Sequence, residues 1–230
     1  MDGFVLGGGG STRMGVDKAR IPFPGSEPMA ISVARCLLPL CERVALVRRG
    51  EPDGLPWPME GSDLEVIRDR QAGTPHPLHG VSTALAAART EWVMVVPCDA
   101  PALSTAVLRS LVVGEPAVAI DASHRLHPLV GVYPKAWVSR AESLARSGGS
   151  ARAFAEGARK IALPDGALKN VNRWSDTGRP GPVRALLDRL GSPEGADRIA
   201  EGELVRLAAV GVMDPEQSFR YARVHCGASR

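Results

Sequence analysis

The feature that most constrains the fold of this 230-residue chain is the alternation of short strand-like runs with longer helical patterns. Strand patterns lie at residues 4–6, 44–47, 65–67, 92–96 and 129–133, of which the run WVMVV at 92–96 is the strongest. Helical patterns lie between them at 27–40, 81–88 and 102–112. Such alternation is typical of a mostly parallel sheet covered by helices on both faces, so we predict an α/β fold.

The composition changes near residue 178. The segment GRPGP at 178–182 breaks regular structure, and only short helical patterns follow it. We therefore predict two parts, a domain over 1–177 and a small helical C-terminal extension over 178–230. The extension carries no chemical motif that we can identify.

The charge and cysteine content exclude several classes of partner and location. The net charge is +3 and the basic residues are scattered, which argues against nucleic-acid or membrane binding. No run approaches the roughly 18 apolar residues that suggest a membrane span. The four cysteines form no Cys-x-x-Cys pair, which suits a reducing cytoplasm. We expect a cytoplasmic protein, and the sequence leaves its oligomeric state open.

The most informative segment is LGGGGSTRMGVDK at residues 6–18, directly after the first predicted strand. Its glycines allow a phosphate to approach main-chain N–H groups, and Arg13 and Lys18 supply cations for a triphosphate. A flexible surface loop is the alternative, which the two cations disfavour. The segment is not a Walker loop, because Val16 stands where that lysine belongs, and it has no G-x-G-x-x-G spacing. It therefore predicts another kind of phosphate-binding loop.

This segment resembles the L-x-G-G-x-S-x-R-M-G-x-D-K signature of the molybdenum cofactor guanylyltransferases and their relatives. Gly7 stands where that family usually has alanine, and the chain has one more glycine than usual. The resemblance implies a Rossmann-like nucleotidyltransferase fold. It also implies that Leu6, Gly7 and Gly8 contact the nucleotide and that Lys18 binds phosphate, and Arg13 would help to neutralise charge on the reacting phosphates.

Asp99 follows the strongest predicted strand, in the sequence PCDAP. Ligands of open α/β sheets bind beyond the carboxyl ends of the strands, and a carboxylate there can hold Mg²⁺ together with substrate phosphate. A helix N-cap is the alternative role for such an aspartate. The stretch resembles the family's P-C-D-x-P motif, which implies that Asp99 binds both Mg²⁺ and the nucleotide.

Asp69 comes after the predicted strand at 65–67, where it is either a turn residue or, as the resemblance implies, a nucleotide contact. The segment PHPLHG at 75–80 resembles the family's P-G-P-L-A-G, which lines the base and ribose pocket. Its histidines, His76 and His79, depart from that pattern.

Two further segments complete the resemblance over residues 1–176. His127-Pro128 resembles the family's H-P segment on the acceptor side, and Asn170-Val171-Asn172 matches its closing N-x-N. Those asparagines either bridge a metal–phosphate site or cap a turn. Because His124 and His127 repeat the His-x-x-His spacing of residues 76 and 79, a zinc site is an alternative with no identifiable carboxylate partner.

The resemblance implies transfer of GMP from GTP to the terminal phosphate of molybdopterin, with release of pyrophosphate and with Mg²⁺ as cofactor. Partners would be GTP, a molybdopterin-type substrate and, transiently, proteins that mature molybdoenzymes. Alternatives in the same superfamily are a cytidylyltransferase and a phospholactate guanylyltransferase. A non-catalytic nucleotide-binding protein is the alternative from another class, disfavoured by the retained Lys18 and Asp99. The missing dinucleotide loop disfavours a dehydrogenase.

Overall fold

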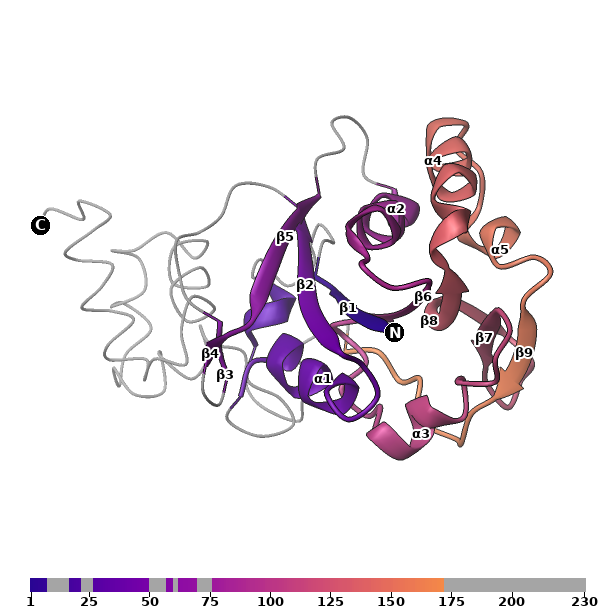
Figure 1. Cartoon of the computed structure of the whole chain (residues 1–230). Coiled ribbons are helices and arrows are strands. Elements are labelled where there is room, and N and C mark those ends of the chain that lie inside the picture. The colour runs from indigo at the N-terminus through magenta and orange to yellow at the C-terminus, as the bar shows by residue number, and fades with distance from the viewer. Residues whose placement is uncertain (8–16, 22–26, 50–56, 60–61, 70–75, 172–230) are drawn as a thin grey trace, which may run out of the picture. The chain divides into compact units, whose positions relative to one another are not determined.

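The computed structural model describes residues 1–7, 17–21, 27–49, 57–59, 62–69 and 76–171 (Figure 1). The chain divides into two compact units, one formed by Met1–Gly10 and Ala30–Asn170 and the other by Ser11–Met29 and Val171–Arg230. Of the second unit, the structure describes residues 17–21, 27–29 and 171. The predicted extension over 178–230 lies outside the described residues.

The first unit is built on a seven-stranded sheet with the strand order β5-β2-β1-β6-β8-β7-β9 (Figure 1). A separate small hairpin pairs β3 with β4. The strands are β1 (Asp2–Leu6), β2 (Arg43–Arg49), β3 (Pro58–Met59), β4 (Ser62–Asp63), β5 (Glu65–Asp69), β6 (Trp92–Pro97), β7 (Ala117–Ile120), β8 (Leu126–Pro134) and β9 (Arg159–Ala162).

The two sides of the sheet are paired differently. Strands β5, β2, β1 and β6 are all parallel. Strand β8 runs antiparallel to both β6 and β7, and β9 is parallel to β7. Most strand pairs are therefore parallel, and the predicted α/β fold with a mostly parallel sheet is confirmed.

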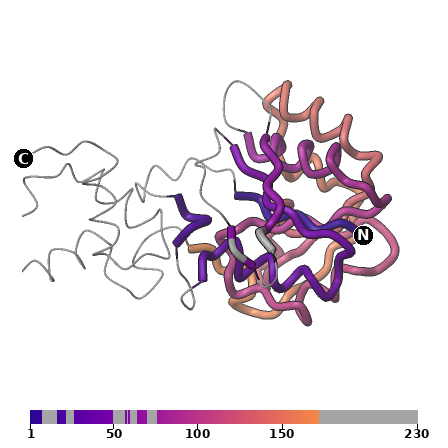
Figure 2. Tube along the Cα trace, turned by 60° about the vertical axis from the view of Figure 1, so that its left-hand side comes forward, coloured from indigo at the N-terminus to yellow at the C-terminus, as the bar shows by residue number. Residues whose placement is uncertain are grey.

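Helices cover both faces of this sheet. Figure 1 shows α2, α4 and α5 on one face and α1 and α3 on the other, and the Cα trace in Figure 2 gives a second view of the same layers. The helices are α1 (Met29–Leu37), α2 (Pro77–Ala87), α3 (Thr105–Arg109), α4 (Val138–Arg146) and α5 (Ala151–Phe154), with 3₁₀ turns η1 (Lys18–Arg20) and η2 (Lys135–Trp137).

The core on the face of the sheet covered by α2, α4 and α5 consists of apolar side chains from both strands and helices. Phe4, Leu78 and Tyr133 are completely buried in it, and the Tyr133 ring packs edge-on against Phe154 with ring centroids 4.8 Å apart. Burying one large apolar side chain contributes about 1.5–3 kcal/mol. The apolar runs that predict strands are thus the residues that hold the layers together.

Local capping explains where helix boundaries differ from the predicted ones. The predicted helix at 102–112 is wrong by several residues, because the Ser104 hydroxyl accepts a hydrogen bond from the Val107 amide and starts α3 at Thr105. Conversely, α2 begins earlier than predicted. His76 caps it, since its Nδ1 accepts from the Leu78 amide at 3.2 Å.

Candidate active site

The end of β1 is held between its two neighbouring strands. The Gly7 amide donates to the Val47 carbonyl of β2 at 2.8 Å, and the Cys98 amide beyond β6 donates to the Leu6 carbonyl at 3.1 Å. The glycine segment therefore begins at the carboxyl edge of the sheet, directly beside the start of the Asp99 turn. Of the predicted residues of this segment, Leu6 and Gly7 are described, whereas Gly8 and Arg13 lie outside the described residues.

Asp99 stands in the turn after β6, two residues beyond the end of the strand, and its side chain is half-buried. The residues around it are fixed, since Cys98 is 7% exposed and Ala100 is completely buried. The sequence prediction that this carboxylate lies at the carboxyl edge of the sheet is confirmed.

Helix α1 anchors the far side of the Asp99 turn. The Cys36 thiol donates to the Leu103 carbonyl at 3.3 Å, and the Thr105 hydroxyl donates back to the Cys36 carbonyl at 2.9 Å. Burial raises the pKa of the Cys36 thiol, so it stays protonated and able to donate. The segment that carries Asp99 is thus attached at both ends, which keeps its position fixed relative to the sheet.

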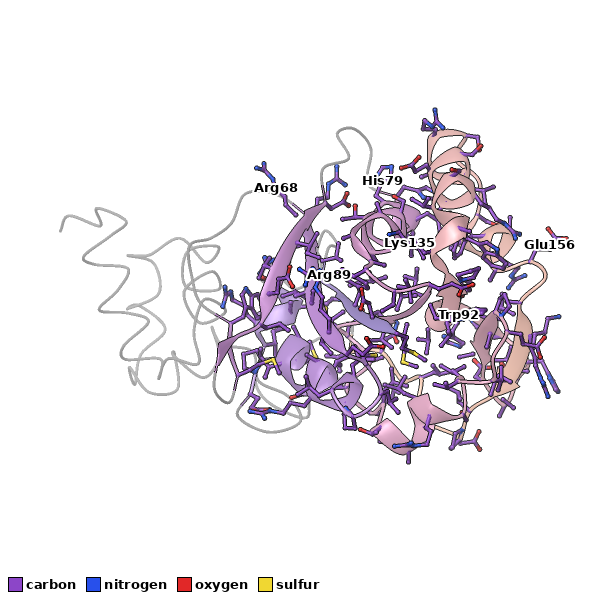
Figure 3. The ribbon with its side chains drawn as sticks, viewed as in Figure 1. Arg68, His79, Arg89, Trp92, Lys135 and Glu156 are labelled. Carbon is purple, nitrogen blue, oxygen red and sulfur yellow. The ribbon has the colours of Figure 1, made fainter. Side chains whose placement is uncertain are left out.

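Asp69 ends β5 and is 8% exposed. Its Oδ1 accepts a hydrogen bond from the Thr83 hydroxyl of α2 at 3.1 Å. The first turn of α2 also reaches β1, because a Cβ atom on Gly80 would lie 3.6 Å from Leu6 Cδ2. The structure therefore brings Asp69, the amino end of α2 and Leu6 together at one edge. Figure 3 shows the neighbouring Arg68 near the end of β5 and His79 on α2 beside it.

The two histidines of α2 have different surroundings. His76 is the helix cap, whereas His79 is 7% exposed and its Nδ1 is buried with no hydrogen-bond partner in the described part of the chain. Their ring centroids are 5.8 Å apart. Among the described residues no three His, Cys, Asp or Glu side chains cluster as a metal site would require, so nothing supports the zinc alternative.

Lys18 belongs to the second unit, where it opens the turn η1. Asp17 caps this turn, because its Oδ1 accepts from the Ala19 amide at 3.0 Å. The Lys18 side chain is half-buried. Asn170 is exposed, and Asn172 lies outside the described residues.

A carboxylate–histidine pair that the sequence analysis missed lies on the hairpin between β7 and β8. Asp121 Oδ2 is 3.0 Å from His127 Nε2. Asp121 Oδ1 accepts hydrogen bonds from the Ser123 amide and hydroxyl and from the Arg125 amide. These bonds, above all the one from His127, hold the pKa of the Asp121 carboxyl well below its usual range. The sequence signal for this pair was an aspartate followed by a short polar turn and a histidine. That signal is weak, because Asp121 and His127 come together only when the hairpin forms.

A family model and curated relatives point to the same family. Residues 3–161 match the family model described as MobA-like NTP transferase domain. A protein of Cereibacter sphaeroides named molybdenum cofactor guanylyltransferase is 34% identical over 190 residues, which cover 77% of this chain and 93% of that protein. No described helix is long and apolar enough to cross a membrane.

Solved structures share the fold. The molybdopterin-guanine dinucleotide biosynthesis protein A of Archaeoglobus fulgidus superimposes with a TM-score of 0.59 at 19% identity, over 81% of this chain and all of that one. A Mycobacterium tuberculosis protein solved in complex with manganese gives a TM-score of 0.54 at 20% identity, over 81% of this chain and 97% of that one. The predicted Rossmann-like nucleotidyltransferase fold is confirmed.

Proposed function

This chain belongs to the MobA-like NTP transferase family and is a nucleotidyltransferase, and we propose that it transfers GMP from GTP to the terminal phosphate of a molybdopterin. In that reaction an oxygen of the acceptor phosphate forms a bond to the α-phosphorus of GTP. The bond between this phosphorus and the bridging oxygen to the β-phosphate breaks, and its electron pair leaves with pyrophosphate. No side chain needs to form a covalent intermediate, so positioning and charge neutralisation suffice.

The observation that carries this proposal is the hydrogen bond from the Cys98 amide to the Leu6 carbonyl. It fixes the Asp99 turn beside the first residues of the glycine segment at the carboxyl edge of the sheet, which is where open α/β sheets bind their ligands. A carboxylate beside the start of a glycine-rich segment is suited to a metal-bound triphosphate.

Asp99 is the residue that would hold Mg²⁺. The donor set fits this ion, because Mg²⁺ in nucleotide sites takes one or two carboxylates and completes its shell with phosphate oxygens and water, so no protein cluster is required. When bound, Mg²⁺ supplies positive charge that stabilises the charge building on the transferred and leaving phosphates.

We assign the remaining predicted residues as follows. Leu6, Gly7, Gly8 and Asp69 would contact the nucleotide, the last through its carboxylate at the end of β5. Lys18 and Arg13 would contribute cations for the phosphates. The support for Leu6, Gly7 and Asp69 is their position at the carboxyl edge of the sheet. The support for Gly8, Arg13 and Lys18 is that they lie within the residues that match the family.

We further infer that the protein works in the cytoplasm on GTP and a molybdopterin-type substrate, in transient contact with proteins that mature molybdoenzymes. Among the described residues, Cys36, Cys41 and Cys98 take part in no disulfide, which supports a reducing compartment. The extension over 178–230 is proposed as a separate helical part.

A nucleotide panel tests the function. Purified protein is incubated with molybdopterin, Mg²⁺ and one of GTP, CTP, ATP or UTP, and both pyrophosphate release and the mass of the product are measured. We expect a product with GTP, because a pocket that pairs the guanine N1–H, N2 amine and O6 leaves buried polar groups unpaired with other bases. A preference of tenfold or more for CTP would identify a cytidylyltransferase. Absence of any nucleotide transfer to molybdopterin would contradict the proposed acceptor.

A further inference from the structure

We propose that Thr105 and Cys36 are positioning residues for the carboxylate of Asp99. Two hydrogen bonds between them join helix α1 to the segment that follows Asp99, and these bonds keep the carboxylate where an octahedral Mg²⁺ ion needs it. The inference rests on the proposed function, because it concerns the ion that Asp99 would hold. Neither residue is assigned a contact with the nucleotide or the metal, so both act through Asp99.

The turn that carries Asp99 is compact. It lies between the end of β6 and the start of α3, beyond the strand pairing of the sheet. The Cys98 amide fixes its near end on the Leu6 carbonyl, and the Leu103 amide closes the turn on the Ala100 carbonyl at 3.2 Å. The side chains of Ala100 and Leu103 are buried. Because the turn moves as one piece, a shift at its far end reaches Asp99.

The far end of this turn is joined to α1 in both directions. The Thr105 hydroxyl donates to the Cys36 carbonyl at 2.9 Å, and the Cys36 thiol donates to the Leu103 carbonyl at 3.3 Å. The Cys36 carbonyl belongs to the last turn of α1, where carbonyls have no partner within the helix. A thiol is a weak donor, and this one also lies 3.4 Å from the Ser32 carbonyl. The Thr105 hydroxyl therefore makes the stronger of the two bonds.

Helix α1 is a firm reference for the position of this turn. Its residues Ala30, Ala34 and Leu37 are completely buried. It also approaches β1 closely, because a Cβ atom on Gly3 would lie 3.3 Å from Leu37 Cδ1. Figure 1 shows α1 and α3 on the same face of the sheet. Since β1 leads directly into the glycine segment, α1 fixes the Asp99 turn relative to the strand that precedes that segment.

The expected consequence is selectivity between metal ions. Mg²⁺ requires near-ideal octahedral geometry with ligands at about 2.0–2.1 Å, whereas Ca²⁺ accepts a flexible shell at about 2.3–2.6 Å. A displaced carboxylate should therefore weaken the binding of Mg²⁺ more than that of Ca²⁺. A role of Thr105 in stability alone would leave the ratio of the two dissociation constants unchanged, so this ratio separates positioning from folding.

Matched variants test the positioning role. Thr105→Val removes the hydroxyl and keeps the branched shape, whereas Thr105→Ser keeps a hydroxyl. Cys36→Ala removes the thiol donor. The control is Ser104→Ala, which removes the cap that accepts from the Val107 amide and leaves the Thr105 hydroxyl in place. Calorimetry measures the Kd for Mg²⁺ and for Ca²⁺ in protein saturated with a GTP analogue whose α–β bridging oxygen is replaced by methylene, so no turnover is needed.

Thr105→Val should raise the Kd for Mg²⁺ roughly three- to tenfold, the size of one lost hydrogen bond, and the Kd for Ca²⁺ by less than about twofold. Thr105→Ser should stay near the wild-type values. Cys36→Ala should shift the ratio in the same direction by less, because a thiol is the weaker donor. Ser104→Ala should lower the free energy of unfolding and leave the ratio unchanged.

Two different results would overturn the inference. A wild-type ratio in Thr105→Val, with Mg²⁺ binding lost in Asp99→Ala, would show that these hydrogen bonds do not position the carboxylate and would leave the proposed function standing. Full Mg²⁺ binding by Asp99→Ala would instead show that the metal assignment is wrong, and the inference would fall with it. If Thr105→Val does not fold, Cys36→Ala decides, and a wild-type ratio there overturns the inference.

Discussion

The two sides of the sheet differ in how their strands are paired and in which polar side chains they carry at the edge where Asp99 stands. On the side of β5, β2 and β1, parallel strands end at one edge with Leu6, Gly7 and Asp69, the proposed nucleotide contacts. On the side of β8, β7 and β9, an antiparallel hairpin presents Asp121 and His127. Strand β6 belongs to both sides and carries Asp99. The proposed nucleotide contacts and the Asp121–His127 pair thus lie on two differently built sides of the sheet, which meet at β6.

The largest effect is expected at the shared residue. Asp99→Ala should reduce Mg²⁺-dependent transfer by about a hundredfold or more, because the charge on the reacting phosphates loses its main stabilisation. The protein should stay folded, since Asp99 is half-buried and outside the core. Steady-state transfer is compared with that of Asp165→Ala, which removes an exposed carboxylate. Near-normal turnover by a folded Asp99→Ala protein would contradict the metal assignment.

A second variant should affect nucleotide binding alone. Lys18→Ala should weaken GTP binding by about 1.5–3 kcal/mol, the size of a hydrogen bond to a charged group, and leave guanosine binding nearly unchanged. Calorimetry with both ligands measures this, and Lys169→Ala, at an exposed lysine, is the control. Equal losses for GTP and guanosine would argue against a phosphate role. A raised KM for molybdopterin in Lys18→Ala would show that the two binding tasks are not separate.

The smallest effects are expected on the free energy of unfolding. A glycine-to-alanine change on β8 should lower it, whereas the same change in α2 should raise it. Gly131→Ala on β8 should destabilise the protein by about 1–3 kcal/mol, because the added Cβ would lie 2.6 Å from the Ala117 carbonyl oxygen. Gly80→Ala in α2 should stabilise it by about 0.5–1 kcal/mol, because its Cβ meets only Leu6 and Val47 at ordinary contact distances and alanine favours the helix. Urea unfolding of both variants measures the difference. A neutral Gly131→Ala would show that the Tyr133 region of β8 is loosely packed.

The sequence predicted the parallel side far better than the antiparallel side. Strands β1, β2 and β6 are buried on both faces, so their apolar runs are visible without any partner. Strand β9 is an edge strand whose first two residues, Arg159 and Lys160, are exposed, so it has no such run. The short β7 and the helices α4 and α5 were also missed.

The same difference limited the prediction of the site. Asp99 could be placed because it follows a strand that the sequence identifies by itself. The Asp121–His127 pair could not, because it forms only when β7 pairs with β8, and β7 was not predicted. The nucleotide contacts of Asp69 and Lys18 stay predictions, since no ligand tests them.

One irregularity of β8 bears on how this protein family can diversify. Between Val118 and Ala119 the register on β8 moves from Gly131 to His127, which leaves residues 128–130 without counterparts on β7. A strand that already carries surplus residues can gain or lose one there without shifting the pairs on either side. Evolution can therefore change the position of the Asp121–His127 pair at the start of β8, while the parallel strands that carry Leu6, Gly7 and Asp69 are inherited unaltered.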